Sequence, residues 1–230
     1  MIYKIDHLAY GSDDFPRDGA LLAASGYAET FCERGVENMV STKGVMRSPS
    51  DRFDIALYEK PGALGVELLN YGRLHQAGPG RFHAGRGNGS PLEDFLALGP
   101  AGSLRLRLAS VDSEASVRFW ELLRFKAADT GGDGPRLVFA SLFGGPETVL
   151  DIAPAQRHEP ASHIDEAGFS VLAFIADSAH KERANFVRHG HAPTVVSPLR
   201  VNGQDLEIFF VRGPEGAVAE VISLRRKPRP

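Results

Sequence analysis

Two glutamates occur inside apolar segments that read as β-strands, where a carboxylate is unexpected. Glu220 lies between Val218 and Ile222 at alternate positions, and Glu67 lies in a similar apolar run. Because alternate side chains of a strand share one face, both carboxylates would point toward apolar surroundings, which is costly for an uncompensated charge. A bound divalent cation would compensate for these charges, and so would a salt bridge to an arginine such as Arg105.

His7 is a third residue that could take part in this chemistry. It stands between Ile5 and Ala9 at alternate positions of the first apolar segment. A neutral imidazole could complete a set of three protein ligands there, although a histidine in a strand can equally be a hydrogen-bonded core or surface group. Mixed oxygen and nitrogen ligands suit Mn, Fe, Ni, Zn or Mg, and such a cation could polarise a carbonyl or chelate an enediolate.

These residues belong to a pattern that the sequence repeats three times. Each copy consists of a strand, a helix with a capping Asp, and a run of strands that ends in a carboxylate. The offset from the first-strand position to the capping Asp is 7 residues in each copy: His7 to Asp14, Arg105 to Asp112 and Ser170 to Asp177. A repeated βαβββ unit of this kind predicts an α+β fold with a cupped mixed sheet around a ligand or metal ion.

The repeats divide the chain into modules and connections. We expect modules at 1–72, 102–155 and 167–225, a Gly/Pro-rich connection at 73–101, a linker at 156–166 and a basic tail at 226–230. A connection as long as the first one is usually a linker, a lid or a disordered stretch, and the sequence is compatible with all three.

Composition restricts the class of protein. The net charge of -3 and the pI near 6.2 give no general attraction to nucleic acid, and no apolar stretch is long enough to span a membrane. Met1 leads directly into a strand pattern, so we expect a cytoplasmic protein without a signal peptide. The single cysteine, Cys32, excludes an intramolecular disulfide and a thiolate zinc site. We therefore expect a small molecule as the binding partner.

Three segments resemble the vicinal oxygen chelate superfamily, which includes glyoxalase I, bleomycin-resistance proteins and extradiol dioxygenases. They are IDHLA at 5–9 in the opening strand, FWELL at 119–123 in a helix, and VRGPEGAVAE at 211–220 in the closing pair of strands. The resemblance implies that two βαβββ modules combine into a cup. It also implies that the cup holds a divalent metal ion between His or Glu ligands of first strands and Glu ligands of last strands.

The resemblance also implies roles for individual residues. His7 matches a first-strand metal ligand, whereas Glu67 and Glu220 match last-strand ligands. Glu220 is in addition the candidate catalytic base. Arg105 and Ser170 occupy the other two first-strand positions, where they would bind substrate, and an arginine there would suit a carboxylate or phosphate group.

The function implied by the resemblance is glyoxalase-like, metal-dependent chemistry on a small oxygenated substrate by an isomerase, lyase or dioxygenase. The competing expectation is a non-catalytic protein of the same fold that binds or sequesters a small molecule, with a metal-free, anion-binding cup as one form of it. Arg105 and Ser170 at ligand positions favour this second expectation. The second module also departs from the family pattern, because it ends in Asp151 where Glu is usual.

Three modules are an odd number for a fold that is built from pairs of modules. One module could therefore pair across a homodimer, since open sheet edges seek partners. Alternatively, residues 72–100 could replace part of a missing module.

Overall fold

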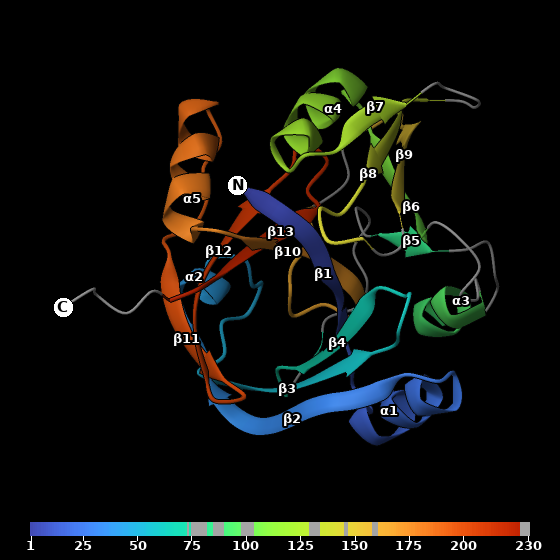
Figure 1. Ribbon diagram of the computed structural model, residues 1–230, viewed down its shortest axis with the longest axis vertical. Coiled ribbons are helices and arrows are strands. Elements are labelled where there is room, and N and C mark those ends of the chain that lie inside the picture. The colour runs from blue at the N-terminus through green and yellow to red at the C-terminus, as the bar shows by residue number, and fades with distance from the viewer. Residues whose placement is uncertain are drawn as a thin grey trace.

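Three stretches of the chain fold in the same order, as a strand, a helix and three further strands (Figure 1). The computed structural model describes residues 1–72, 74, 82–84, 90–97, 104–128, 134–144, 147–157 and 161–225. The first stretch holds β1 (Ile2–Gly11), α1 (Phe15–Ala24), β2 (Ala28–Glu37), the short α2 (Val40–Lys43), β3 (Arg52–Glu59) and β4 (Gly65–Asn70). The second holds β6 (Leu104–Ser110), α4 (Ser113–Leu122), β7 (Lys126–Ala128), β8 (Arg136–Phe139) and β9 (Thr148–Pro154). The third holds β10 (Gly168–Ala176), α5 (Ala179–Arg188), β11 (Ser197–Val201), β12 (Gln204–Arg212) and β13 (Val218–Leu224).

In each of these modules the first strand pairs in parallel with the last one. Thus β1 pairs with β4, β6 with β9 and β10 with β13. Since β1 and β10 also pair with each other in antiparallel orientation, modules one and three share an 8-stranded sheet in the order β11-β12-β13-β10-β1-β4-β3-β2. The sheet curves into a cup, and the backbone N–H of Asn202 donates a hydrogen bond to Glu33 where the edge strands β11 and β2 approach each other (Figure 1). The predicted fold class is confirmed, and the module boundaries stay our proposal.

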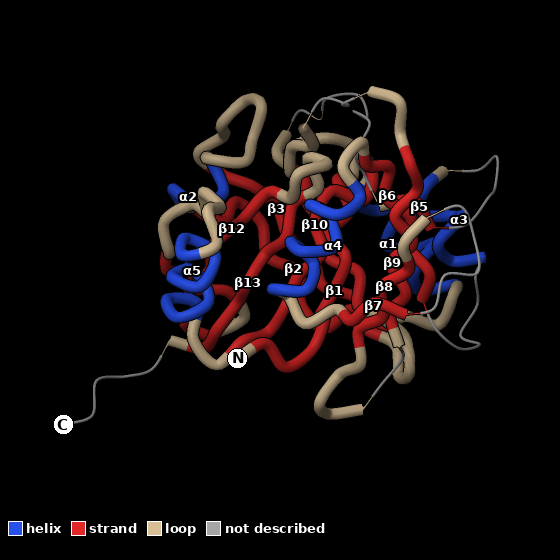
Figure 2. Tube along the Cα trace, turned by 90° about the horizontal axis from the view of Figure 1, so that it is seen from above, coloured by secondary structure: helices blue, strands red, loops and turns tan. Residues whose placement is uncertain are grey.

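Module two forms a second sheet together with a strand from the connection. β5 (His83–Ala84) pairs in antiparallel orientation with β6, in the sheet order β5-β6-β9-β8-β7, and α3 (Pro91–Ala97) follows β5 along the chain. Figure 2 shows this sheet gathered at one end of the molecule. β5 takes the position against β6 that β10 takes against β1. This arrangement supports the expectation that the connection replaces part of a missing module, because modules one and three pair within a single chain.

Much of the predicted connection at 73–101, and all of the predicted basic tail at 226–230, lie outside the described residues. Within the part that the structure describes, no helix is long and apolar enough to cross a membrane.

Short polar side chains start the three module helices. The carboxylates of Asp14 and Asp112 each accept a hydrogen bond from a backbone N–H three residues further on, at the starts of α1 and α4. In module three the cap is the hydroxyl of Ser178, whereas Asp177 binds the N-terminal ammonium group of Met1. The capping Asp therefore recurs in two of the three modules, and the third uses the next residue.

Apolar side chains form separate clusters on the two faces of the 8-stranded sheet. Leu8 and Leu172 belong to the cluster that packs against the helices and module two. Ala9, Val171 and Ala173 belong to the second cluster, which lies inside the cup. This inner cluster surrounds the site described below.

A buried carboxylate joins module three to module two. Glu215, in the turn between β12 and β13, accepts a hydrogen bond from the indole N–H of Trp120 at 2.9 Å and another from the hydroxyl of Ser116 at 2.8 Å. Both donors lie on α4, and all three residues are buried. Burial raises the pKa of Glu215 above its ordinary value, and the two hydrogen bonds oppose that shift. The contact fixes how module two sits against the closing turn of the cup.

Candidate metal centre

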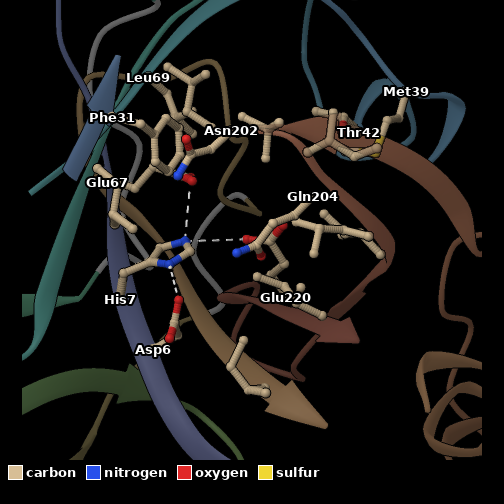
Figure 3. A pocket seen from close by; sticks show the side chains of 18 of the residues that line it. Asp6, His7, Phe31, Met39, Thr42, Glu67, Leu69, Asn202, Gln204 and Glu220 are labelled. Carbon is tan, nitrogen blue, oxygen red and sulfur yellow. Dashed lines mark hydrogen bonds and ion pairs between the residues drawn. The ribbon is translucent and has the colours of Figure 1, made fainter. Parts of the chain in front are cut away.

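A cavity of about 380 Å³ lies inside the cup (Figure 3). All eight strands of the large sheet contribute side chains to its wall, together with α2. Most of the lining side chains are apolar, and the polar ones include His7, Glu67 and Glu220. A volume of this size is typical of small-molecule sites, which span roughly 300 to 1,000 Å³.

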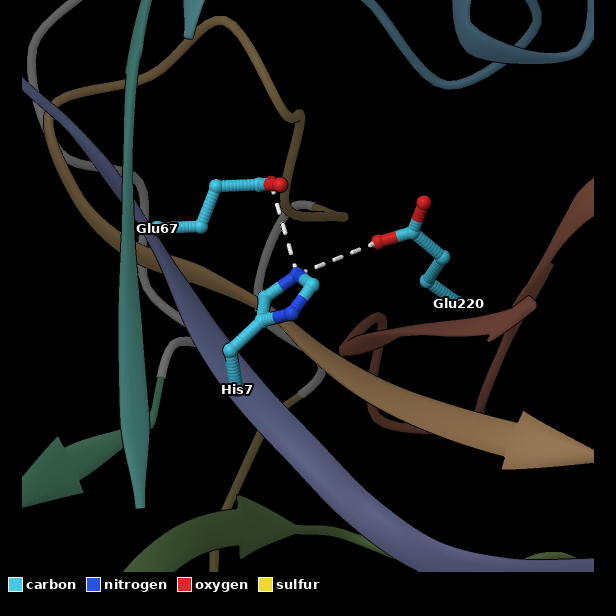
Figure 4. A group of neighbouring side chains, drawn as sticks. All are labelled: His7, Glu67 and Glu220. Atoms are coloured by element: carbon cyan, nitrogen blue, oxygen red, sulfur yellow. Dashed lines mark ion pairs between the residues drawn. The ribbon is translucent and has the colours of Figure 1, made fainter. Parts of the chain in front are cut away.

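The structure brings His7, Glu67 and Glu220 into one cluster (Figure 4). One potential ligand atom from each residue lies within 4.8 Å of the others. Nε2 of His7 is 3.4 Å from Oε2 of Glu67 and 3.7 Å from Oε2 of Glu220. His7 and Glu220 are buried, with 3% and 6% of their surfaces exposed. Among the described residues, this is the group of three that could hold a metal ion.

Strand pairing explains how residues so far apart in the sequence converge. Glu67 lies beside Ala9, His7 lies beside Ala173, and Ala173 in turn lies beside Glu220. Neighbouring strands are about 4.8 Å apart, so these side chains project from adjacent strands on the same concave face. The two alanines are small, which leaves room for the longer side chains to approach each other between them.

A β-bulge in β1 adds a fourth polar residue to the site. Ile5 pairs with Phe174 and His7 pairs with Ala173, so Asp6 is an extra residue between two consecutive pairs. Such a bulge re-aims side chains, and both Asp6 and His7 line the cavity. Simple alternation places Ile5 on the same face as His7 and Asp6 on the other face. That prediction is wrong, because Ile5 packs into the outer apolar cluster.

Asp6 determines which nitrogen of His7 faces the cluster. Its Oδ2 lies 3.1 Å from Nδ1 of His7, and a carboxylate can only accept a hydrogen bond. A neutral imidazole therefore carries its proton on Nδ1 and directs the lone pair of Nε2 toward the two glutamates. Nε2 is buried and has no hydrogen-bond partner among the described residues. Metal-binding histidines usually have this arrangement, with a carboxylate on the other ring nitrogen.

The charges of the cluster are strongly coupled. Burial opposes an imidazolium at His7, but the carboxylates of Glu67, Asp6 and Glu220 outweigh burial and raise its pKa well above the ordinary value. Burial also raises the pKa of Glu220, and the negative charge of Glu67 adds to this. The raised pKa values of His7 and Glu220 have the same cause. Two carboxylates lie close together in a buried site and require positive charge, which protons or a divalent cation can supply.

The donor set fits a divalent cation. One imidazole nitrogen and two carboxylate groups form three protein ligands, which leaves coordination positions for water and substrate. Nε2 of His7, which has no hydrogen-bond partner in the described part of the chain, the half-buried Glu67 and the buried Glu220 have an explanation if the cation is their common partner. The types of ligand atom are compatible with Mn, Fe, Ni, Zn and Mg.

Replacing Asp6 with Ala should weaken metal binding without removing a ligand. The imidazole would lose the acceptor that holds it in the metal-binding tautomer, which typically costs about 10- to 100-fold in affinity. Calorimetric titration with Zn²⁺ would measure the change, and the stoichiometry should stay at one ion per chain. Unchanged affinity would show that Asp6 has no positioning role. Thr30→Ala, another polar residue of the cavity wall, is the matched control.

Comparison with solved structures identifies the fold of the chain. No family profile and no curated protein sequence matches the chain. A mutant of glyoxalase I from Zea mays matches in structure with a TM-score of 0.59 and 13% identity, covering 96% of this chain and 92% of that chain. This chain has the vicinal oxygen chelate fold. The oxidase ChaP-H2 also matches, with a TM-score of 0.40 and 13% identity over 54% of this chain and 94% of that chain.

Arg105 lies outside the cavity of the cup, although its register position corresponds to that of His7. Arg105 pairs with Val149, two residues before Asp151. In the same way, His7 pairs with Gly65, two residues before Glu67. Its Nε lies 3.3 Å from Asp151, and Arg136 binds the same carboxylate at 2.7 Å. Arginines thus neutralise the acid of module two, and a substrate-binding role for Arg105 in this cavity does not fit its position.

Ser170 also lies outside the cavity, because a second β-bulge shifts its strand. Ala9 pairs with Val171 and Tyr10 pairs with Phe169, so Ser170 is the extra residue. Ser170 is fully buried, and Val171 takes the place on the inner face that Ser170 is expected to fill. The predicted contact between Ser170 and substrate therefore does not fit the structure.

Several residues that line the cavity were not expected from the sequence. They are Asp6, Tyr71, Asn202 and Gln204, which line the wall with His7. Figure 3 shows Asp6, Asn202 and Gln204 around the cavity. Tyr71 stacks on Phe53 with ring centroids 5.4 Å apart. Burial raises the pKa of Tyr71 well above its ordinary value, so its phenol stays neutral. The Asn-Gly hairpin at 202–203 was a visible signal, but nothing in the sequence indicates that this hairpin reaches the mouth of the cavity.

Proposed function

We propose that this protein is a glyoxalase-like, metal-dependent enzyme of the vicinal oxygen chelate type that acts on a small oxygenated substrate. The reaction would be that of an isomerase, a lyase or a dioxygenase. His7, Glu67 and Glu220 would hold a divalent cation (Mn, Fe, Ni, Zn or Mg). The observation that supports this most directly is the buried Nε2 of His7, which has no hydrogen bond to any residue that the structure describes and faces two carboxylates at 3.4 and 3.7 Å.

Each residue of the site has a part in this proposal. A cation, when bound, would polarise two adjacent oxygens of the substrate. Asp6 keeps the proton of His7 on Nδ1, away from the cation. Glu220, which lines the cavity, is the candidate base that accepts a proton from the substrate. The apolar wall excludes water and strengthens these electrostatic interactions.

The second candidate function is a protein that binds a small molecule without turnover. Arg105 and Ser170 at ligand positions are the features that favour it in the sequence. Since both lie outside the cavity, we favour the enzyme. A homodimer and a cytoplasmic location stay predictions, and measurement of the solution mass would test the dimer.

Metal titration followed by an activity screen tests the proposed function. The chain is stripped with a chelator, titrated with Mn²⁺, Ni²⁺ or Zn²⁺, and assayed with vicinal diketones, hydroxyketones and catechols. We expect one ion per chain and turnover that Glu220→Gln abolishes, whereas Glu59→Gln, a change at another carboxylate of the wall, keeps it. Absence of metal binding by the unmodified chain would contradict the metal site. Ligand binding without turnover for any metal would favour the binding protein.

A further inference from the structure

Beyond the metal cluster, the cavity wall is mostly aromatic and aliphatic. The inward-facing side chains include Phe31, Phe53, Leu199, Ile208, Phe210 and Ile222. All of these except Phe31 are buried. Figure 3 shows Phe31 and Leu69 on the same side of the cavity as Glu67, with Met39 across from them. An apolar ligand would gain roughly 25 cal/mol for each Å² of apolar surface that it buries against such a wall.

The charges on the wall oppose an anionic ligand. Asp6, Glu59, Glu67 and Glu220 all line the cavity, whereas Lys4 is the only lysine or arginine among the lining residues that the structure describes. Nζ of Lys4 lies 2.6 Å from Oδ1 of Asp6, so its charge is already compensated. A divalent cation would balance Glu67 and Glu220 and would leave no positive charge for a carboxylate or phosphate of the ligand.

Two arginines near the cup are engaged in ion pairs elsewhere. Arg34 binds Asp54, and Arg47 binds the buried Glu166. The side chains at the mouth that remain for recognition include the neutral amides of Asn202 and Gln204 (Figure 3). Amides can bind hydroxyl or carbonyl groups without favouring a charge. A ligand anion would therefore lose its hydration among carboxylates without gaining a cationic partner.

We propose that the substrate is an uncharged, largely apolar molecule with two adjacent oxygens, such as an alkyl- or aryl-substituted catechol, diketone or hydroxyketone. Molecules that carry a carboxylate or phosphate are excluded. The adjacent oxygens rest on the proposed metal-dependent function. The preference for an uncharged apolar body rests on the cavity wall alone, so the two parts can be tested separately.

The wall is tested without metal by two fluorescent dyes that differ in one charged group. Phenylnaphthylamine is neutral, and anilinonaphthalene sulfonate adds a sulfonate to the same aromatic body. The neutral dye should bind one molecule per chain, and the sulfonate should bind about ten-fold or more weakly. Equal or tighter binding of the sulfonate at the same site would overturn the proposal, and so would failure of the neutral dye to bind.

Variants locate the dye and supply the missing charge. Leu206→Trp fills the cavity from a half-buried position of β12 and should weaken the neutral dye about ten-fold, whereas Leu142→Trp, outside the cavity, should not. Leu224→Arg adds a cation at an exposed position of the rim and should strengthen the sulfonate only. Neutral-dye binding that Leu206→Trp leaves unchanged would place the dye elsewhere and overturn the proposal.

The metal-dependent part is tested on the Zn²⁺-loaded chain with methylcatechol and protocatechuate, which differ by a methyl and a carboxylate group. Methylcatechol should bind about ten-fold or more tightly. Equal binding, or tighter binding of protocatechuate, overturns the substrate class while the metal site stands. If the chain binds no Zn²⁺, the proposed function fails, and the dye experiment still decides whether the cavity selects uncharged apolar molecules.

Discussion

Replacing His7 with Ala should lower the affinity for Zn²⁺ or Mn²⁺ by about 100-fold or more, since three ligands share a binding free energy of many kcal/mol. His7 supplies the only nitrogen among the three candidate ligands of the described cluster, and its Nε2 lies between the two carboxylates. Its removal leaves Glu67 and Glu220 as an incomplete set. Calorimetric titration of the chelator-stripped chain measures the change.

Two control variants separate the loss of a ligand from general damage. Glu59→Ala removes a carboxylate of the cavity wall that is not part of the cluster. Arg105→Ala changes the position in module two that corresponds to His7. Both controls should bind the metal as the unmodified chain does. Full metal affinity in His7→Ala, with unchanged stoichiometry, would eliminate the proposed coordination set.

Replacing Glu215 with Ala should destabilise the protein by about 2 to 4 kcal/mol, because the indole N–H of Trp120 and the hydroxyl of Ser116 lose a buried acceptor. For a chain of this size such a change lowers the melting temperature by about 5 to 10 °C. Glu215→Gln should cost less, because its amide oxygen can still accept one of the two hydrogen bonds. Calorimetric melting of the two variants measures both effects.

Glu121→Ala is the matched control for this prediction. Glu121 lies in the last turn of α4 and is exposed, so its removal should leave the melting temperature nearly unchanged. An equal melting temperature for Glu215→Ala and the unmodified chain would show that the buried contact contributes nothing to stability.

The sequence contains enough information to predict the modules and the three members of the cluster. Modules repeat the same order of elements, and acids inside apolar strands are conspicuous because a charge in such a place needs compensation. His7 can be predicted as a third ligand because it occupies the first-strand position of the first module. The parallel pairing of each first strand with its last strand then brings the first-strand and last-strand residues to the same face.

The two β-bulges are what the sequence does not reveal. Alternation of side chains assumes an unbroken ladder, and one extra residue reverses the face of every residue beyond it. At Asp6 the bulge adds a positioning carboxylate to the site, and at Ser170 it removes a residue that the repeat offset places there. The buried contact between Glu215 and α4 depends on how module three packs against module two. The spacing of the repeats along the sequence does not specify this packing.

The seam between β1 and β10 has a consequence for synthesis of the protein on the ribosome. His7 leaves the ribosome 213 residues before Glu220 (220 − 7 = 213), and β1 has no antiparallel partner until β10 has been made. Contacts between residues so distant in sequence form slowly, because loop closure must precede them. Products truncated before β10 would therefore expose an unpaired β1 edge and be prone to aggregate, and the proposed set of metal ligands would be complete only after Glu220 has been made.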